Sequence, residues 1–133
     1  MILVAACLAG HAKADIPWFT IIGDRNDPAA DTIEINPVAV SRNGPVRVME
    51  IRVSRSAERM SGDGVKFRSF RGEVEFDCAR PSARFVRSQF FAEPLWESPT
   101  VQLNYPPSKL RPMEFRLFEP NPKDKVIRAA CQG

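Results

Sequence analysis

Proline most constrains how this chain can fold, because twelve of its 133 residues are proline. A proline inside a helix removes a backbone hydrogen bond and clashes with the preceding turn, and a proline inside a sheet is tolerated only at an edge. Four prolines fall within residues 93–111, where they exclude a helix or a central strand. We therefore expect short strands joined by turns, with an extended surface loop over residues 93–111.

Composition and charge exclude several classes of function. The chain is 44% hydrophobic and 26% charged, as is typical of a globular domain, and its net charge of +3 is too small to indicate nucleic-acid binding. His11 is the single histidine, which removes most histidine-based acid–base chemistry and metal ligation. We therefore predict one domain over residues 15–133 that is not an enzyme and uses no metal and no cofactor.

The first fourteen residues have the pattern of a secretory signal. Residues 1–10 are apolar but too few to span a membrane, and Ala12-x-Ala14 is the small-residue pattern that signal peptidase cuts. Cleavage would make Asp15 the first residue of the mature chain. No basic residue precedes the apolar run, so we expect residues 1–14 to be a signal truncated at its N-terminus.

Two other interpretations of this segment remain. In a bacterial lipoprotein signal, Cys7 of Val4-Ala5-Ala6-Cys7 would carry the lipid and begin the mature protein. In the third interpretation the segment is a buried N-terminal strand or helix. Both signal interpretations place the protein in the periplasm or at the outer-membrane surface, without a transmembrane segment.

Two cysteines remain once the leader is set aside. An even pair in an exported chain is typical of a disulfide, so we predict a bond between Cys78 and Cys131. Closing a loop of this length stabilises the folded state by about 4 kcal/mol on the chain-entropy scale. The alternative is two buried free thiols. Neither cysteine belongs to a Cys-x-x-Cys motif, so redox catalysis is not indicated.

Alternating polarity predicts several strands. Residues 73–78 give the clearest example, with Val74, Phe76 and Cys78 on one side and acidic residues on the other. Further strands are expected over residues 18–22, 32–35, 38–40, 46–53, 65–70 and 84–91, with one more edge strand over residues 113–118.

The connections between these strands also leave signals. Asn43-Gly44 is typical of a tight hairpin turn, and the change of apolar phase after it predicts a bulge near Val48 or Met49. A second hairpin is expected over residues 78–82. Gly72 is expected to break or bend the strand that contains it.

The C-terminus carries the one good helix signal. Asn121 suits the N-cap and Pro122 the first helical position, while Val126, Ile127 and Ala130 form one apolar face. The predicted fold is therefore α+β: an antiparallel sheet of about five to six strands, with a C-terminal helix packed on it and one disulfide.

Arginine is unevenly distributed along the chain. Residues 42–87 contain eleven basic and six acidic residues, a balance of +5. Arginine binds carboxylates, sulfates and phosphates with two parallel hydrogen bonds, so a convergent patch would suit a protein or polyanion partner. We predict that Arg68, Arg71, Arg84 and Arg87 contribute to such a surface. The alternative is that they pair across strands with nearby carboxylates.

Two further features are candidates for catalysis. Glu73 and Glu75 share one strand face at a spacing of about 6 to 7 Å, which glycosidase carboxylates also use, but solvent-facing acids are common on half-buried strands. Ser69 has no histidine or other base near it in the sequence to activate it. A hydrolase is therefore the least favoured interpretation.

Several short motifs together resemble the bacterial surface-adhesin protein E family. They are the early Trp18, the Phe67-x-Ser69 step, the Asp77-Cys78 strand end and the terminal helix from Asn121 to Cys131. Two positions depart from the family pattern. Phe67 stands where tyrosine is usual, and Phe115 stands near the place where the family often has a second tryptophan before the terminal helix. The resemblance covers most of the mature chain.

The resemblance implies an exported α+β domain, sometimes dimeric, that binds host extracellular-matrix or serum proteins and brings no catalytic residues. The function predicted is therefore that of an exported, non-enzymatic, adhesin-like binding protein. The alternative is a periplasmic inhibitor or assembly factor that acts on another protein. A protruding loop over residues 93–111 would favour that alternative.

Overall fold

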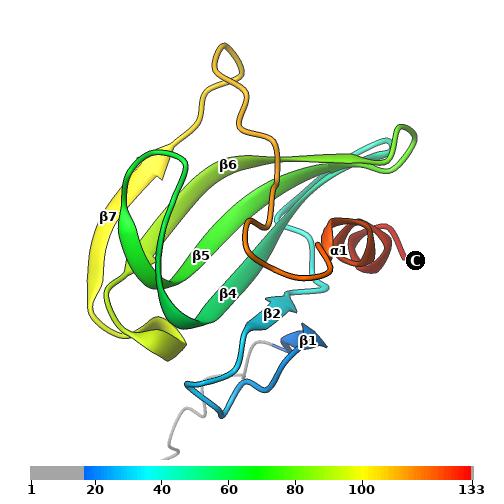
Figure 1. Ribbon diagram of the computed structural model, residues 1–133. Helices are drawn as coiled ribbons and strands as arrows, with labels where there is room; N and C mark the ends of the chain where they lie inside the picture. Colours follow the sequence, from blue (N-terminus) through cyan, green and yellow to red (C-terminus); the bar gives the residue numbers. More distant parts are fainter. Residues whose placement is uncertain (1–16, 133) are drawn as a thin grey trace, which may run out of the picture.

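The computed structural model describes residues 17–132 of the chain (Figure 1). The predicted signal segment, its cleavage site and Cys7 lie outside the described residues. The strands are β1 (Phe19–Ile22), β2 (Thr32–Ile35), β3 (Ser41–Asn43), β4 (Val46–Met60), β5 (Lys66–Asp77), β6 (Ser82–Phe91) and β7 (Pro99–Asn104). A short 3₁₀ turn, η1 (Pro94–Trp96), precedes β7, and the helix α1 (Lys123–Ala130) follows it.

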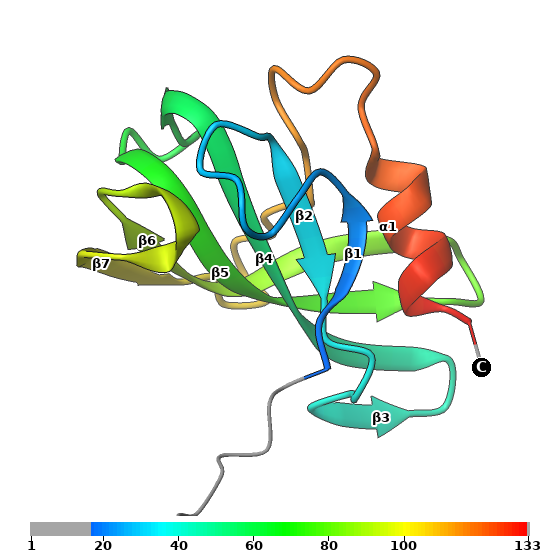
Figure 2. The same ribbon diagram turned by 90° about the horizontal axis from the view of Figure 1, so that it is seen from below.

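The strands form one antiparallel sheet in the order β1-β2-β4-β5-β6-β7, with β3 paired to β4 as a seventh strand. The three long strands β4, β5 and β6 follow one another through hairpins and make the centre of the sheet. Figures 1 and 2 show α1 beside β1 and β2, on one side of the sheet. The α+β architecture predicted from the sequence is confirmed.

The hydrophobic core lies between α1 and the face of the sheet that the helix covers, here called the inner face. Val126, Ile127 and Ala130 are the buried residues of α1, as their spacing predicts. They join a cluster that includes Ile51 and Phe76. Burying a valine or isoleucine side chain stabilises the fold by about 1.5 to 3 kcal/mol, so this stripe holds the short helix in place. The helix begins two residues after Asn121, whose side-chain oxygen accepts a hydrogen bond from the Lys123 N–H.

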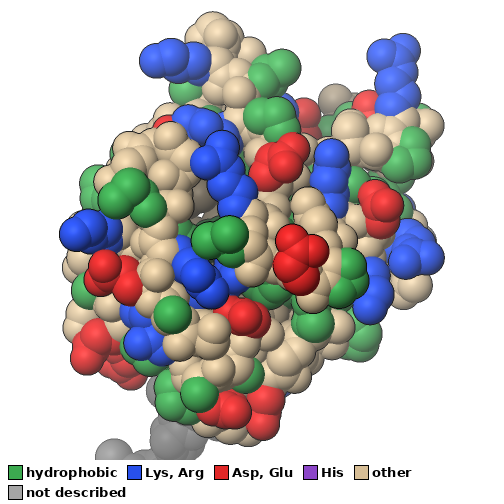
Figure 3. All heavy atoms as spheres, in the orientation of Figure 1, with side chains coloured by type: hydrophobic (Ala, Val, Ile, Leu, Met, Phe, Trp, Pro, Cys, Tyr) green, Lys and Arg blue, Asp and Glu red, His purple; other side chains and the backbone are tan. Residues whose placement is uncertain are grey.

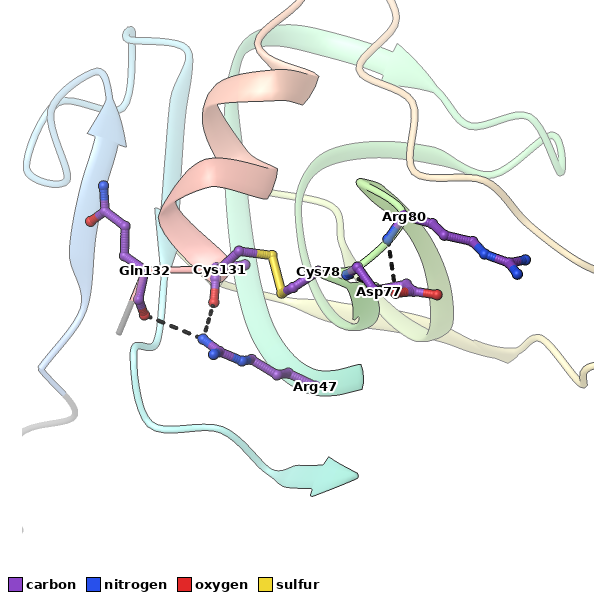
Figure 4. The surroundings of a disulfide bond; sticks show 8 residues. Arg47, Asp77, Cys78, Arg80, Cys131 and Gln132 are labelled. Carbon is purple, nitrogen blue, oxygen red and sulfur yellow. Dashed lines mark hydrogen bonds between the residues drawn. A yellow bond between two sulfur atoms is a disulfide. The ribbon is translucent and has the colours of Figure 1, made fainter. Parts of the chain in front are cut away.

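The disulfide between Cys78 and Cys131 ties the end of α1 to the sheet (Figure 4), with 5.6 Å between the two Cα atoms. Beside it, the Arg47 guanidinium donates hydrogen bonds to the carbonyl oxygens of Ala130 and Gln132, at 3.0 and 3.2 Å. The last carbonyls of a helix have no partner within the helix and carry partial negative charge. A covalent bond and a cation therefore both anchor the C-terminal end of the helix.

The predicted bulge near Val48 and Met49 is wrong. β4 pairs regularly with β5 through this region, and its irregularity lies between Ser54 and Arg59. Side chains alternate between the two faces without interruption along this part of β4. Arg47, and not a valine, therefore takes the inner-face position before Met49. There it contacts the helix end instead of apolar side chains.

The expectation that Gly72 breaks its strand is wrong, because β5 continues through it, although the register with β6 shifts directly afterwards, between Glu73 and Val74. A Cβ atom at this position would lie 3.3 Å from the ring of Phe85 and 3.4 Å from the Arg87 carbonyl oxygen. Glycine here lets the aromatic ring of the neighbouring strand pack close to the backbone, and a Cβ atom would push that ring away by a few tenths of an ångström.

Two other segments differ from expectation. The predicted surface loop over residues 93–111 contains η1 and β7, which pairs with β6 as an edge strand. Pro99 is the first residue of β7, where a missing N–H does not interrupt the ladder. Residues 113–118 form no strand: Met113, Phe115 and Phe118 are buried in the core, while Leu117 adopts a φ of 62°.

Candidate functional site

The face of the sheet opposite α1, here called the outer face, carries an array of charged side chains. They alternate along each strand with the core residues of the inner face. The strand register places Arg52 beside Arg71 and Glu50 beside Glu73. The charged residues joined by ion pairs on this face are Arg25, Glu34, Glu50, Arg52, Arg71, Glu73, Glu75, Arg84 and Arg87.

Three of the four arginines predicted to bind a partner lie on the outer face, and each is paired with a glutamate. The Arg71–Glu50 and Arg87–Glu73 pairs measure 3.2 and 2.7 Å between nitrogen and oxygen. The side chains of Arg71 and Arg87 remain 42% and 53% exposed. Both arginines are therefore held in position and open to solvent.

Arg84 is the third of these arginines. It donates two hydrogen bonds to Glu75, at 2.9 and 3.2 Å, and its side chain is only 21% exposed. The two glutamates weighed as a catalytic pair, Glu73 and Glu75, do share the outer face, and each is engaged by an arginine of β6.

Arg68 is not brought together with the other three arginines. Arg68 lies three residues before Arg71 in β5, so the two side chains leave the strand on opposite faces. Arg68 donates hydrogen bonds to the backbone carbonyl oxygens of Arg55 and Pro28, both at 3.1 Å. These contacts join the end of β5 to the loop before β2.

Glu34 is the buried centre of the outer face. Its carboxylate is fully buried and contacts Arg52 at 2.7 Å through one oxygen and Arg25 at 3.0 Å through the other. The Thr20 hydroxyl also donates to it, at 2.7 Å. A buried carboxylate needs such complete pairing because its desolvation is costly.

Two tryptophans surround the arginine that binds Glu34. The Arg52 guanidinium carbon lies 4.4 Å from the ring centre of Trp18 and 3.9 Å from that of Trp96. Burial lowers the pKa of Arg52, and the ion pair with Glu34 opposes this change. The cation is thus held by a carboxylate and two indole rings.

Trp96 reaches Arg52 because η1 and the following residues adopt an uncommon backbone. Leu95, Trp96 and Ser98 all have positive φ, between 56° and 62°. Each such residue costs about 1 to 3 kcal/mol unless its surroundings impose the conformation. Cross-links from the sheet do so here, since the Ser69 hydroxyl accepts a hydrogen bond from the Trp96 N–H and Ser54 accepts one from the Leu95 N–H.

Ser69 also donates a hydrogen bond to the Glu93 carbonyl oxygen at 2.7 Å. Its hydroxyl therefore has a structural role, which is to hold η1 against the sheet. Sequence reasoning identified Ser69, Trp18 and the paired arginines, but it missed Glu34 and Arg52. The one available signal was the acidic residue inside the short alternating segment 32–35.

The fold and site define an α+β domain whose sheet has a core covered by a disulfide-anchored helix and an opposite face of paired charges. The sequence profile of the surface-adhesin protein E family matches residues 18–132, and the chain belongs to this family. Membership places it among adhesin-like surface proteins. No curated protein and no solved structure matches the chain significantly. Within residues 17–132, no helix is long and apolar enough to cross a membrane.

Proposed function

We propose that the protein is an exported, non-enzymatic adhesin-like protein that binds a macromolecular partner through the outer face of its sheet. Export rests on the signal pattern of residues 1–14, and adhesion on family membership. The observation that carries the choice of surface is the pair of exposed, pre-positioned arginines Arg71 and Arg87 on the sheet face opposite α1.

The outer face has residue types that suit protein recognition, and ion pairs already hold several of its side chains in place. Arginine and tryptophan are enriched among the residues that dominate binding energy at interfaces. Side chains already held by ion pairs lose little conformational freedom when a partner binds, which lowers the entropic cost of association. Arg71 and Arg87 can bind carboxylates of the partner, either in place of their own glutamates or in addition to them.

The charge balance of this face favours a protein over a polyanion. Five arginines and four glutamates take part in its ion pairs, a net charge of +1. A uniformly anionic chain would meet four carboxylates, whereas a protein surface of mixed charge can complement both signs. The proposed partner is therefore a protein, with host extracellular-matrix and serum proteins as the first to test.

The experiment compares two double variants that remove the same charge. Arg71→Ser with Arg87→Ser alters the outer face, while Arg42→Ser with Arg128→Ser alters exposed arginines of β3 and α1. Retention on immobilised vitronectin and laminin is measured at low and moderate salt, after thermal melting has confirmed the fold.

We expect the outer-face variant alone to lose retention, by several-fold at low salt and less at moderate salt because exposed charges are screened. Arg68→Ser, which lies away from this face, is expected to behave like the parent. Equal retention of the two double variants would remove the outer face from the mechanism. Immobilised heparin serves as a polyanion for comparison. If both double variants lost retention on heparin and neither lost it on the proteins, the binding would depend on overall charge.

One observation favours the inhibitor or assembly-factor alternative. The turn after β7 projects from the sheet (Figure 1), and Leu110 at this turn is 64% exposed. Binding to a periplasmic enzyme that is lost in Leu110→Ser and kept in the outer-face double variant would support this alternative over adhesion.

A further inference from the structure

A cavity of about 330 Å³ lies on the inner face, beside the part of the sheet that α1 covers. Its floor is aromatic: Phe67, Phe70, Phe85 and Phe90 come from β5 and β6, with successive ring centres 5.4 to 5.9 Å apart. Figure 3 shows a hollow over these strands, with lysine or arginine side chains at its border. A cavity of this size and lining is typical of a site for a small apolar ligand.

The segment after β7 forms the other wall. Tyr105 and Phe118 line the cavity from this side. The Tyr105 hydroxyl donates a hydrogen bond to Asp63 at 2.9 Å, and Arg111 forms an ion pair with the same carboxylate. Burial and the nearby Asp63 raise the pKa of Tyr105 to about 12, so the phenol stays neutral and keeps this bond. The wall is therefore fixed to the β4–β5 turn.

The charged residues of the lining are mostly arginines. Four arginines face two acids, Asp63 and Glu114, which leaves an excess of two positive charges. Arg55 is committed to Asp31 and to backbone carbonyls, and Arg111 to Asp63.

The other two arginines, Arg59 and Arg116, have no ion pair with any residue in the described range 17–132. The Arg59 Nε is moreover buried without a hydrogen-bond partner among those residues. A buried donor without an acceptor is unfavourable, and an anionic ligand would supply the acceptor.

We propose that this cavity binds a small amphipathic carboxylate, with its aliphatic chain against the four phenylalanine rings and its carboxylate at Arg59 and Arg116. The volume lies near the lower end of the range of about 300 to 1,000 Å³ for small-molecule sites, so a medium-chain acid fits and a folded partner does not. Arginine binds a carboxylate with paired, charge-assisted hydrogen bonds, which fixes the orientation of the acid. This ligand site is separate from the outer face.

The test uses three probes with the same ten-carbon chain: decanoate and decyltrimethylammonium below their critical micelle concentrations, and decanol below its solubility limit. Calorimetry gives the affinities, and amide NMR shifts locate the site. Decanoate is expected to bind most tightly, with shifts at Ser88 and Tyr105 in the cavity and none at Trp18 on the outer face. Decanol or the ammonium probe binding as tightly as decanoate would overturn the assignment of the anionic end, and no binding of decanoate would overturn the site.

Variants test the two arginines against a matched control. Arg59→Gln and Arg116→Gln are each expected to weaken decanoate binding about ten-fold, the loss of one charge-assisted hydrogen bond, and to leave decanol binding unchanged. Arg128→Gln removes the same charge from the exposed side of α1 and is expected to have no effect. Equal weakening in all three variants would show non-specific attraction and refute the proposal, whereas retention on matrix proteins reports on the outer face independently.

Discussion

Replacing Glu34 with glutamine should destabilise the fold far more than the same change elsewhere on the outer face. The substitution keeps the side-chain shape but leaves Arg52, only 18% exposed, without its carboxylate. Breaking a buried ion pair by removing one partner costs about 3 to 5 kcal/mol. The two indole contacts of Arg52 are the same in the parent and the variant, so they do not change this difference. We therefore expect Glu34→Gln to lower the free energy of unfolding by about 3 kcal/mol, at the lower end of the range because water still reaches part of Arg52.

The matched control is Glu75→Gln, which removes a partly exposed glutamate from the pair with Arg84 and should cost at most about 1 kcal/mol. Denaturant unfolding followed by tryptophan fluorescence gives both values. The double variant Glu34→Gln with Arg52→Gln should be less destabilised than the sum of the two single variants, because it leaves no unpaired buried charge. A cost for Glu34→Gln no larger than that for Glu75→Gln would refute the role given to burial.

Three further predictions concern stability. Cys78→Ser with Cys131→Ser opens a bond that spans 53 positions and should lower the free energy of unfolding by about 4 kcal/mol, measured by denaturant titration. Burial raises the pKa of Asp31, but hydrogen bonds and the Arg55 guanidinium lower it on balance below its usual 3.8. The stability lost in Asp31→Asn should therefore be full above about pH 4 and vanish as the pH falls through the lowered pKa, as unfolding titrations at several pH values would show. Gly72→Val should cost about 1 to 3 kcal/mol, because its methyl groups meet the ring packed against this position, and a melting temperature equal to the parent's would contradict that packing.

The elements predicted correctly are those in which residues close together in the sequence determine which side is buried. In residues 73–78 the alternation of Val74 and Phe76 with acids specifies both a strand and its buried side, wherever the strand lies in the sheet. The stripe of α1 is local in the same sense, since three apolar positions define one helix face. The cysteine pair could be predicted because only two cysteines remained.

The elements predicted wrongly depend on partners distant in the sequence. Prolines exclude a central strand, but an edge strand needs its ladder on one side only, so β7 tolerates Pro99 at its start. Met113 and Phe115 have the spacing of a strand, but pairing with β6 stops after a single bridge between Arg84 and Pro112, closed by the hydrogen bond from the Met113 N–H to the Ala83 carbonyl oxygen. The side chains of Met113 and Phe115 complete the core instead.

The arginine-rich stretch shows the same limit for the candidate site. A count of charges along residues 42–87 gives +5, but it does not tell on which face each side chain lies or which carboxylate faces it. Arg71 and Arg87 meet Glu50 and Glu73 only because the register of β4, β5 and β6 brings them together. Charge composition indicated the residues, and strand register determined their neighbours.

The segment that sequence patterns described least well connects the two candidate sites. It begins on the outer face, where Trp96 covers Arg52, then passes along the edge of the sheet as β7, and ends on the inner face, where Tyr105 lines the cavity. Since β7 is held to β6 by main-chain pairing, the two ends of the segment are fixed independently, one by the serines of β4 and β5 and the other by Asp63. A change at one end should therefore leave the other in place, and this is why the outer-face variants and the cavity variants can test the two proposed activities separately.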